Sequence, residues 1–251
     1  MKTKWRRSLA AMSFLFYTLP VYADVIYSND FENTSTPLTE WSYKGSTPPG
    51  DPVGITPGTA QHPADRFIGQ FSGNDSTILT LNNLPAHTSL TSSFDLYLIR
   101  TWDGTGYVGA GPDIWDLSIK DGQTLLHTTF SNQELSGNIY QTYPNQYPGS
   151  ASPARSGAIE NNTLGFVYLD VGINRVCDSV YHLSFTFPHS AGTVSLDFSS
   201  VGLQNNFING NVYDESWGLD NVTVTPEPAT LLLLGLGGLA IIRKKRSSFG
   251  C

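Results

Sequence analysis

The sequence predicts an all-β protein whose body is an antiparallel sandwich of two sheets, similar to a jelly roll. Apolar and polar residues alternate with a period of two nearly everywhere between residues 24 and 225, as in strands with one buried face. These short runs are separated by Gly, Pro, Asn and Asp, which is typical of all-β domains. No run in this body shows the 3.6-residue apolar period of an amphipathic helix.

The alternation is clearest in two central runs. Phe94, Leu96 and Leu98 share one face of the first run, and Trp115 and Leu117 share one face of the second. Because the first and last strands of a sandwich are often neighbours, the outermost runs are expected to pair. Shorter runs of the same kind predict further strands at residues 25–31, 39–44, 66–71, 76–81, 164–170 and 216–224.

Two β-hairpins are expected. Residues 114–129 contain two alternating runs around a tight turn at Asp121-Gly122. Residues 183–198 alternate in the same way on both sides of a Pro- and Gly-containing turn at 188–192. Each pair of runs is therefore predicted to lie side by side in one sheet.

Residues 1–23 have the composition of a secretory signal peptide. A basic N-terminus precedes an apolar run at 9–19, and the small residue Ala23 provides a signal-peptidase site. We expect this segment to form a short helix that signal peptidase removes after Ala23. Export implies that the sandwich domain, residues 24–225, folds outside the cytoplasm.

The charge of the body excludes one class of partner. The whole chain has 14 basic and 21 acidic residues. Eight of the basic residues lie in the signal segment and in residues 243–246, so residues 24–228 retain six basic and all 21 acidic residues, a formal charge of −15. Nucleic acid is not an expected partner, since phosphate binding needs a basic surface. Clustered carboxylates favour divalent cations instead.

No motif of a known catalytic class is present. The nucleophile elbow G-x-S-x-G, the zinc motif H-E-x-x-H and the P-loop are absent, and the five His are scattered. Two carboxylates could still meet in space, as in glycosidases, and the candidates are Asp113, Asp116, Asp214 and Glu215. Nothing in their spacing singles them out. We therefore assign no catalytic residue and expect a protein that is not an enzyme.

A metal site is one interpretation of the acids near the two ends of the body. Asp30 and Glu32 lie two residues apart, on one face of the first strand. In the last strand the apolar alternation changes phase around Asp220-Asn221, so either a bulge lies there or Asp220 points inward. If the two strands pair, Asp30, Glu32 and Asp220 form an oxygen site for structural Ca²⁺. The alternative is a bulge with solvated acids.

The Gly-rich stretch 102–115 is a second acidic position. Asp103 opens it and Asp113 closes it, between strands that carry Trp102 and Trp115. These Asp and Gly residues either supply turn geometry alone or line a metal or ligand loop. In the second case Trp102, Asp103 and Asp113 are the candidate ligand-binding residues. Both Trp are in register with core residues, so we expect them to be mostly buried.

The C-terminal 26 residues, 226–251, differ from the body. Pro226, Glu227 and Pro228 precede an uncharged stretch, 229–242, whose helix would span roughly 21 Å, less than the ~30 Å hydrocarbon core. Three Gly residues weaken this helix further. The positive-inside rule keeps the basic cluster that follows it in the cytoplasm. The segment is thus a marginal membrane anchor, and the cluster consists of Arg243, Lys244, Lys245 and Arg246.

This order of a Pro-Glu-Pro, an apolar helix and a basic cluster closely resembles the PEP-CTERM sorting signal of Gram-negative bacteria. The resemblance implies an exosortase that cuts near residues 226–228, after a transient stay in the inner membrane. It also implies a destination at the cell surface or in the extracellular matrix, where such proteins are linked with polysaccharide and biofilm. The extension at 247–251 is slightly longer than usual.

The body is similar to an uncharacterised group of PEP-CTERM proteins with a lectin-like sandwich, through the stretches 94–104, 111–119 and 215–224. That resemblance implies a fold rather than an activity. We expect a secreted, non-catalytic module that associates with extracellular polysaccharide. A glycan-active hydrolase or lyase on the same fold and a purely structural matrix protein are the alternatives.

Overall fold

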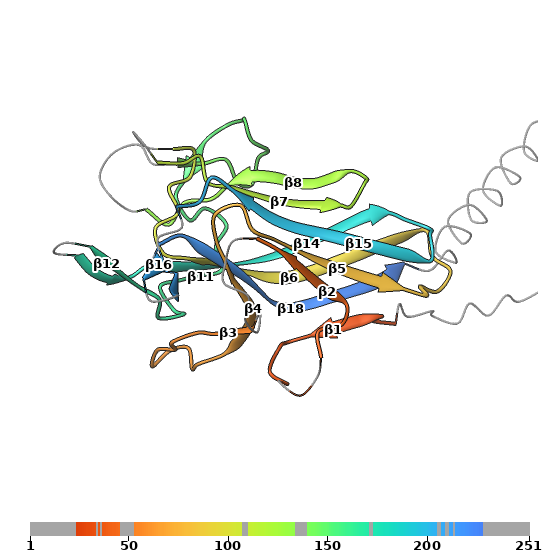
Figure 1. Ribbon diagram of the computed structural model, residues 1–251. Coiled ribbons are helices and arrows are strands. Elements are labelled where there is room, and N and C mark those ends of the chain that lie inside the picture. Colours follow the sequence, from red (N-terminus) through yellow and green to blue (C-terminus); the bar gives the residue numbers. More distant parts are fainter. Residues whose placement is uncertain are drawn as a thin grey trace, which may run out of the picture.

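The computed structural model confirms an all-β body built from two main antiparallel sheets (Figure 1). The predicted signal segment 1–23 and everything from residue 228 onward lie outside the described residues, so the two terminal helices stay predictions. The structure describes residues 24–33, 35, 37–45, 53–106, 110–133, 140–170, 173–204, 207–208, 211–212 and 214–227.

The larger sheet has seven strands. Its order is β11-β14-β6-β18-β4-β3, and β1 also pairs with β18. The first and last strands are therefore neighbours, as the sequence predicts. The strands are β1 (Tyr27–Asn29), β3 (Val53–Ile55), β4 (Arg66–Phe71), β6 (Ser89–Ile99), β11 (Glu160–Asn161), β14 (Asp178–Pro188) and β18 (Ser216–Glu227).

The smaller sheet has five strands in the order β2-β5-β15-β7-β8. They are β2 (Trp41–Lys44), β5 (Ser76–Asn82), β7 (Ile114–Ile119), β8 (Thr124–Thr129) and β15 (Thr193–Val201). Short two-stranded ribbons pair β9 (Tyr140–Gln141) with β10 (Ser152–Pro153), β12 (Val167–Asp170) with β13 (Ile173–Val176), and β16 (Phe207–Ile208) with β17 (Asn211–Val212).

One of the two predicted hairpins is confirmed and the other is wrong. β7 and β8 pair directly around the turn at 120–123. β14 and β15 are also consecutive, but β14 pairs with β6 in one sheet while β15 pairs with β5 and β7 in the other. Their connection therefore crosses the sandwich. Alternation identifies a strand with one buried face, but either sheet can bury that face.

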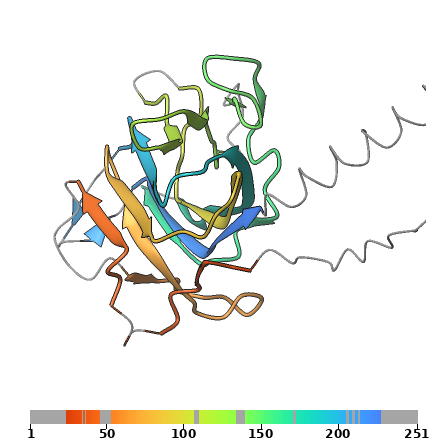
Figure 2. The same cartoon turned by 90° about the vertical axis from the view of Figure 1, so that its right-hand side faces the viewer.

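The core between the sheets is mainly aromatic. Phe198 of β15 lies at its centre, with its ring centroid 5.3 Å from that of Phe94, 5.9 Å from that of Trp41 and 6.3 Å from that of Trp115. Trp115 also meets Trp217 edge-on at 5.8 Å. Seen from the end, the strands surround this core (Figure 2). Rings at these separations add specific contacts to the large apolar area that they bury.

A second, smaller cluster covers half of the outer face of the seven-stranded sheet. It contains Phe67, Tyr97, Ile99, Leu164, Phe166 and Val180. The rest of that face is polar and partly or fully exposed. We call it the open sheet face, and its residues are Thr91, Ser93, Asp95, His182, Ser184 and Thr186.

A β-bulge in β18 explains the change of phase seen in the sequence. Trp217 and Leu219 face the core before the bulge, and Val222 and Val224 face it afterwards. The register against β6 shifts between Asp220 and Thr223, and Asn221 (φ 50°) has the left-handed conformation that Asn tolerates. Asp220 is also buried, at 2% exposure. The change of phase is therefore the bulge, and Asp220 does not point into the core: it lies opposite Asp95 of β6 and contacts Tyr97 of the outer cluster.

The central position of Phe198 leads to a prediction on stability. Phe198→Ala removes a fully buried ring from between both sheets and should lower the free energy of unfolding by about 3–5 kcal/mol. Val201→Ala, at a 47% exposed position of the same strand, should change it by less than about 0.5 kcal/mol. Chemical denaturation of both variants measures the difference. Equal effects would contradict the central role of the ring.

Candidate metal centre and sorting segment

Three carboxylates meet at one end of the sandwich. Asp103 and Asp113 belong to the connection between β6 and β7, and Glu215 directly precedes β18. Each contributes a carboxylate oxygen, and these oxygens all lie within 4.8 Å of one another. Asp113 and Glu215 have no exposed surface, and Asp103 is 7% exposed. The sequence marked Asp103 and Asp113 as a metal or ligand loop, and it named Glu215, more than 100 residues away, only as a possible glycosidase carboxylate.

The loop that carries the two Asp residues is held by backbone contacts. Gly104 (φ 67°) has the conformation that favours glycine, and a Cβ there would come within 2.1 Å of the Tyr140 carbonyl oxygen. The Asp113 N–H donates to the Gly104 carbonyl at 2.9 Å. The indole N–H of Trp102 donates to the Ser216 carbonyl at 2.8 Å. This bond ties the loop to the segment that carries Glu215.

Donors within the carboxylate group are few. Gln133 Nε2 donates to Asp103 Oδ1 at 3.0 Å, and the Gln204 N–H donates to Glu215 Oε2 at 2.6 Å. The Asp103 N–H donates to one Asp113 oxygen. The other oxygen, Asp113 Oδ1, is buried and has no donor among the residues that the structure describes. With its amide oriented to satisfy both of its ends, Gln204 Nε2 donates to Glu215 Oε1 at 3.0 Å and to Asp103 Oδ2 at 3.2 Å. The group therefore offers more buried acceptors than it has donors.

Burial raises the pKa of all three carboxyl groups. Desolvation is the largest cause for each, and it raises Asp113 and Glu215 far above the ordinary range. The charges of the neighbouring acids, Asp214 among them, raise the pKa values further. At neutral pH the group must therefore hold protons or a counter-ion, because ionised carboxylates this close repel one another.

The structure removes Trp102 from the candidate ligand-binding set. Its side chain is fully buried, and its ring lies 6.5 Å from that of Phe130 in the core. The sequence predicts this burial, because Trp102 is in register with residues of the core. The buried ring has no face on which a ligand could stack. Asp103 and Asp113 remain together, as members of the buried carboxylate group.

Two of the three acids predicted to form a calcium site, Asp30 and Glu32, follow β1, whereas Asp220 lies within β18. Asp30 Oδ1 accepts the Glu32 N–H at 3.2 Å, and Glu32 Oε1 accepts the Arg66 N–H at 2.7 Å. Asp220 lies elsewhere, at the Tyr97 hydroxyl. Among the described residues, the acids whose oxygens all lie within 4.8 Å of one another are Asp103, Asp113 and Glu215. Metal binding by Asp30, Glu32 and Asp220 stays a prediction.

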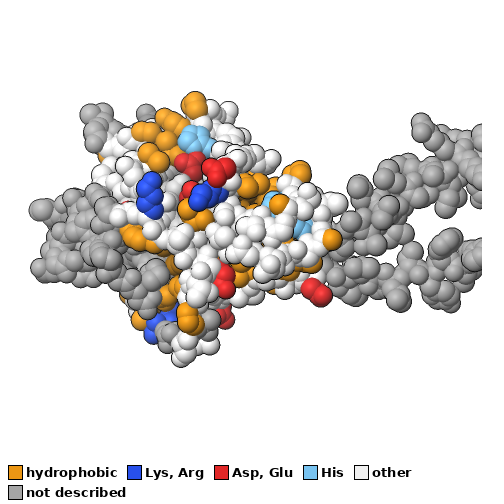
Figure 3. Space-filling view, turned by 45° about the vertical axis from the view of Figure 1, so that its right-hand side comes forward, with side chains coloured by type: hydrophobic (Ala, Val, Ile, Leu, Met, Phe, Trp, Pro, Cys, Tyr) orange, Lys and Arg blue, Asp and Glu red, His pale blue; other side chains and the backbone are white. Residues whose placement is uncertain are grey.

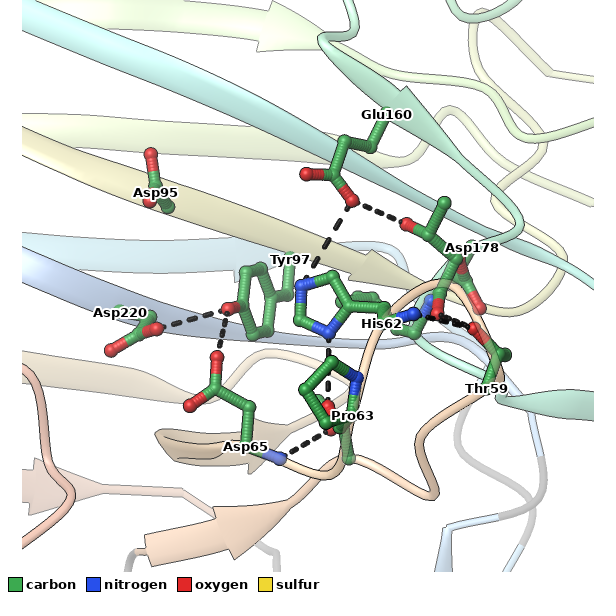
Figure 4. Close-up of polar contacts among 12 residues, drawn as sticks. Thr59, His62, Pro63, Asp65, Asp95, Tyr97, Glu160, Asp178 and Asp220 are labelled. Atoms are coloured by element: carbon green, nitrogen blue, oxygen red, sulfur yellow. Dashed lines mark hydrogen bonds and ion pairs between the residues drawn. The ribbon is translucent and has the colours of Figure 1, made fainter.

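Asp220 lies in an acidic network of its own. The Tyr97 hydroxyl is 2.9 Å from Asp220 Oδ2 and 3.3 Å from Asp65 Oδ2 (Figure 4). One hydroxyl hydrogen can satisfy only one of these carboxylates. Burial, with smaller contributions from the charges of Asp65 and Asp95, raises the pKa of Asp220 to about 7.

The remaining candidate acids occupy separate places. Asp116 lies on the outer face of the five-stranded sheet, with its Oδ1 2.5 Å from His127 Nδ1. Asp214 accepts the Thr101 hydroxyl at 2.8 Å. Charged side chains are few on the face in Figure 3, where acidic groups lie beside basic ones. Seven of the 21 acidic residues of the chain are buried within the part that the structure describes.

The open sheet face contains a contact set that sequence spacing did not reveal. His182 Nδ1 lies 2.7 Å from Asp95 Oδ1, and His182 Nε2 lies 3.2 Å from Ser93 Oγ. Asn221 Nδ2 donates to the second Asp95 oxygen at 2.8 Å. These residues come from three strands, so only the pairing of β14, β6 and β18 brings them together.

The last strand leads directly into the predicted sorting signal. Pro226 and Glu227 end β18 and lie opposite Leu90 and Ser89 of β6. The family model of the PEP-CTERM protein-sorting motif matches residues 224–246. The chain carries a PEP-CTERM sorting signal. Pro228 and the basic residues Arg243, Lys244, Lys245 and Arg246 fall within this match but outside the described residues.

The PEP-CTERM signal identifies a surface or extracellular protein that an exosortase processes. It says nothing about the sandwich, because the match begins only at the end of β18. The described part of the chain contains no helix of the length and apolarity that a membrane span requires. Removal of the signal peptide and a transient membrane anchor stay predictions.

Solved structures resemble the sandwich only distantly, and no curated protein matches the chain. A cleaved adhesin domain of Lys-gingipain from Porphyromonas gingivalis is 11% identical and has a TM-score of 0.36, over 80% of this chain and 99% of that one. A carbohydrate-binding module of Cellvibrio mixtus lichenase 5A, in complex with cellotriose, is 12% identical with a TM-score of 0.29, over 80% and 98%. A similarity this weak does not indicate what the sandwich binds.

The raised pKa of Asp220 makes stability depend on pH. Its folded pKa of about 7 lies above the ordinary 3.8, so its contribution is fully present below about pH 4 and is lost as pH rises through 7. The loss approaches about 4 kcal/mol. Asp220→Asn cannot ionise and should flatten this part of the profile. Denaturation of both proteins between pH 4 and 8 measures it, and parallel profiles would contradict it.

Proposed function

We propose that this protein is a non-catalytic module of the cell surface or extracellular matrix that associates with polysaccharide. The sorting signal is the observation that carries the proposal, because its first residues, Pro226 and Glu227, belong to the last strand of the sandwich. The sandwich is thus the folded part of an exosortase-processed chain. Its accessible surface is where a matrix partner would bind.

The open sheet face supports association with a polar polymer. Thr91 Oγ1 and Thr186 Oγ1 lie 2.8 Å apart, and His182 is held by Asp95 at 2.7 Å. These hydroxyl, imidazole and carboxylate groups are the donors and acceptors that sugar hydroxyls pair with. Cross-strand contacts hold them in place before a ligand arrives, which reduces the entropy that binding must overcome.

The buried carboxylate group supports a non-catalytic function. Glycosidases place two carboxyls about 5–9.5 Å apart on either side of a bond that substrate brings between them. Asp113 and Glu215 have no exposed surface, and an oxygen of one lies within 4.8 Å of an oxygen of the other. A glycan cannot reach them without opening the loop. The burial of these two acids, which are among the four glycosidase candidates in the sequence, therefore favours a structural role.

One contact set favours a hydrolytic alternative. Ser93, His182 and Asp95 follow the order of a nucleophile, a base and a group that orients the base, at 3.2 and 2.7 Å. The His182 side chain is 55% exposed, however, so water competes for both of its nitrogens. A general base is most effective in a site from which water is excluded. We favour binding over hydrolysis at this face for that reason.

The binding proposal predicts the result of a glycan array on the exported protein. Asp95→Asn combined with His182→Ala should lower the signal at least tenfold on whichever polysaccharide the parent protein binds. Asp116→Asn combined with His127→Ala removes the same kind of Asp-His pair from the opposite sheet and should leave the signal unchanged. If the parent protein binds no glycan, the chain is a structural matrix protein instead.

The hydrolytic alternative has its own test. A fluorophosphonate probe reacts with a serine that is activated by a base, and we expect it to leave Ser93 unlabelled. Ester hydrolysis by the exported protein should likewise not change in Ser93→Ala. Labelling that disappears in Ser93→Ala but persists in Ser184→Ala, an exposed serine of the same face, would identify an enzyme and overturn the non-catalytic proposal.

A further inference from the structure

We propose that Asp103, Asp113 and Glu215 bind one calcium ion, which holds the loop end of the sandwich together. The ion is structural and does not depend on polysaccharide binding. The site lies at the opposite end of β18 from the sorting segment, because Glu215 precedes this strand and Glu227 ends it. Eleven residue steps of extended strand separate Ser216 from Glu227 by about 36 Å.

The first observation is the convergence of oxygens. One oxygen from each of the three carboxylates lies within 4.8 Å of the other two, and all three side chains are buried. Calcium ligands that surround one ion at 2.3–2.6 Å have this mutual spacing. The residues come from two connections that are far apart in the sequence, so local turn geometry alone does not explain their meeting.

The second observation is an unsatisfied buried oxygen. Among the described residues, Asp113 Oδ1 has no hydrogen-bond donor, although its side chain is completely buried within the group. An orphaned buried acceptor is costly, and more so when it is charged. Gln133 Oε1 is also buried without a donor, while Nε2 of the same amide contacts Asp103. A cation in the group would satisfy Asp113 Oδ1, which has no donor in the part of the chain that the structure describes.

Another buried acid shows how the chain satisfies a carboxylate without an ion. Asp178 is also completely buried. Its two oxygens accept the backbone N–H groups of Leu164 and Phe166, each at 3.1 Å. Neither oxygen is left without a donor. Asp178 therefore shows that full burial does not by itself leave a carboxylate oxygen without a donor, although Asp197 Oδ1 is also buried without one among the described residues.

The donor set selects the kind of cation. The three ligands are carboxylates, and no His or Cys belongs to the group. Oxygen ligands suit hard cations and disfavour zinc and copper. Calcium accepts six to eight oxygens in irregular geometry, whereas magnesium demands a near-ideal octahedron and keeps several waters. A buried set of crowded carboxylates, on a chain that is sorted to the outside of the cell, fits calcium better.

The ion would reinforce a junction that hydrogen bonds already join. The Trp102 indole N–H to the Ser216 carbonyl, at 2.8 Å, links the loop after β6 to the start of β18. The Glu215 N–H donates to the Gln204 carbonyl at 3.1 Å. Calcium bound to Asp103, Asp113 and Glu215 adds direct bonds across the same junction. Its removal should loosen the loop end and leave the sheets paired.

Thermal unfolding of the exported protein tests the proposal. We expect calcium to raise the melting temperature of EDTA-stripped protein by about 5–10 °C at a hundredfold excess over its dissociation constant, and magnesium to raise it much less. Asp113→Asn should abolish the calcium shift. Because this change also removes a buried charge, the variant should fold without calcium and remain measurable.

Two matched variants locate the ion. Asp220→Asn and Asp178→Asn are the same substitution at buried acids outside the group, and both should retain the full calcium shift. Terbium, a luminescent calcium substitute, should be sensitised by the neighbouring Trp102 and displaced by calcium, and it should give no such signal in Asp113→Asn. A melting temperature indifferent to calcium would overturn the proposal. So would a shift that survives in Asp113→Asn, and one lost in Asp220→Asn would assign the ion to the other acidic network.

Discussion

Three carboxylates that cannot all stay ionised without a counter-charge set the main constraint on this protein. Asp103, Asp113 and Glu215 meet where the loops at one end of the sandwich are tied to the start of β18. Burial disfavours their charged forms, and their mutual repulsion adds to that cost. The loop end can therefore be stable only with protons or a cation in the group. Outside the cell, where calcium is abundant, a cation resolves this conflict without requiring an acidic medium.

The aromatic core offsets the cost of burying these three carboxylates. Phe198, Trp115 and Trp217 fill the space between the sheets, and their burial stabilises strand pairing independently of the loops. The two ends of the sandwich then serve different purposes. One end concentrates negative charge, while at the other the last strand continues into the sorting signal. The length of β18 keeps exosortase processing away from the carboxylate group.

Strands were predictable from the sequence because alternation reports directly on one-sided burial. Residues 66–71 were predicted as a strand and form β4 with the same limits. The change of phase in the last strand indicated the bulge at Asn221. Alternation carries no information on which sheet a strand joins, so the consecutive runs at 183–198 were wrongly paired.

The sequence predicted only part of the carboxylate group, because it does not show which strands pair. Asp103 and Asp113 were marked by the Gly-rich loop between them, but the link to Glu215 exists only after β6 and β18 pair.

A high-resolution crystal structure of the exported protein grown with calcium tests the central claim most directly. The account predicts one ion bound by Asp103, Asp113 and Glu215, with oxygen distances of about 2.3–2.6 Å. Carboxyl groups hydrogen-bonded directly to one another, with no ion between them, would contradict it.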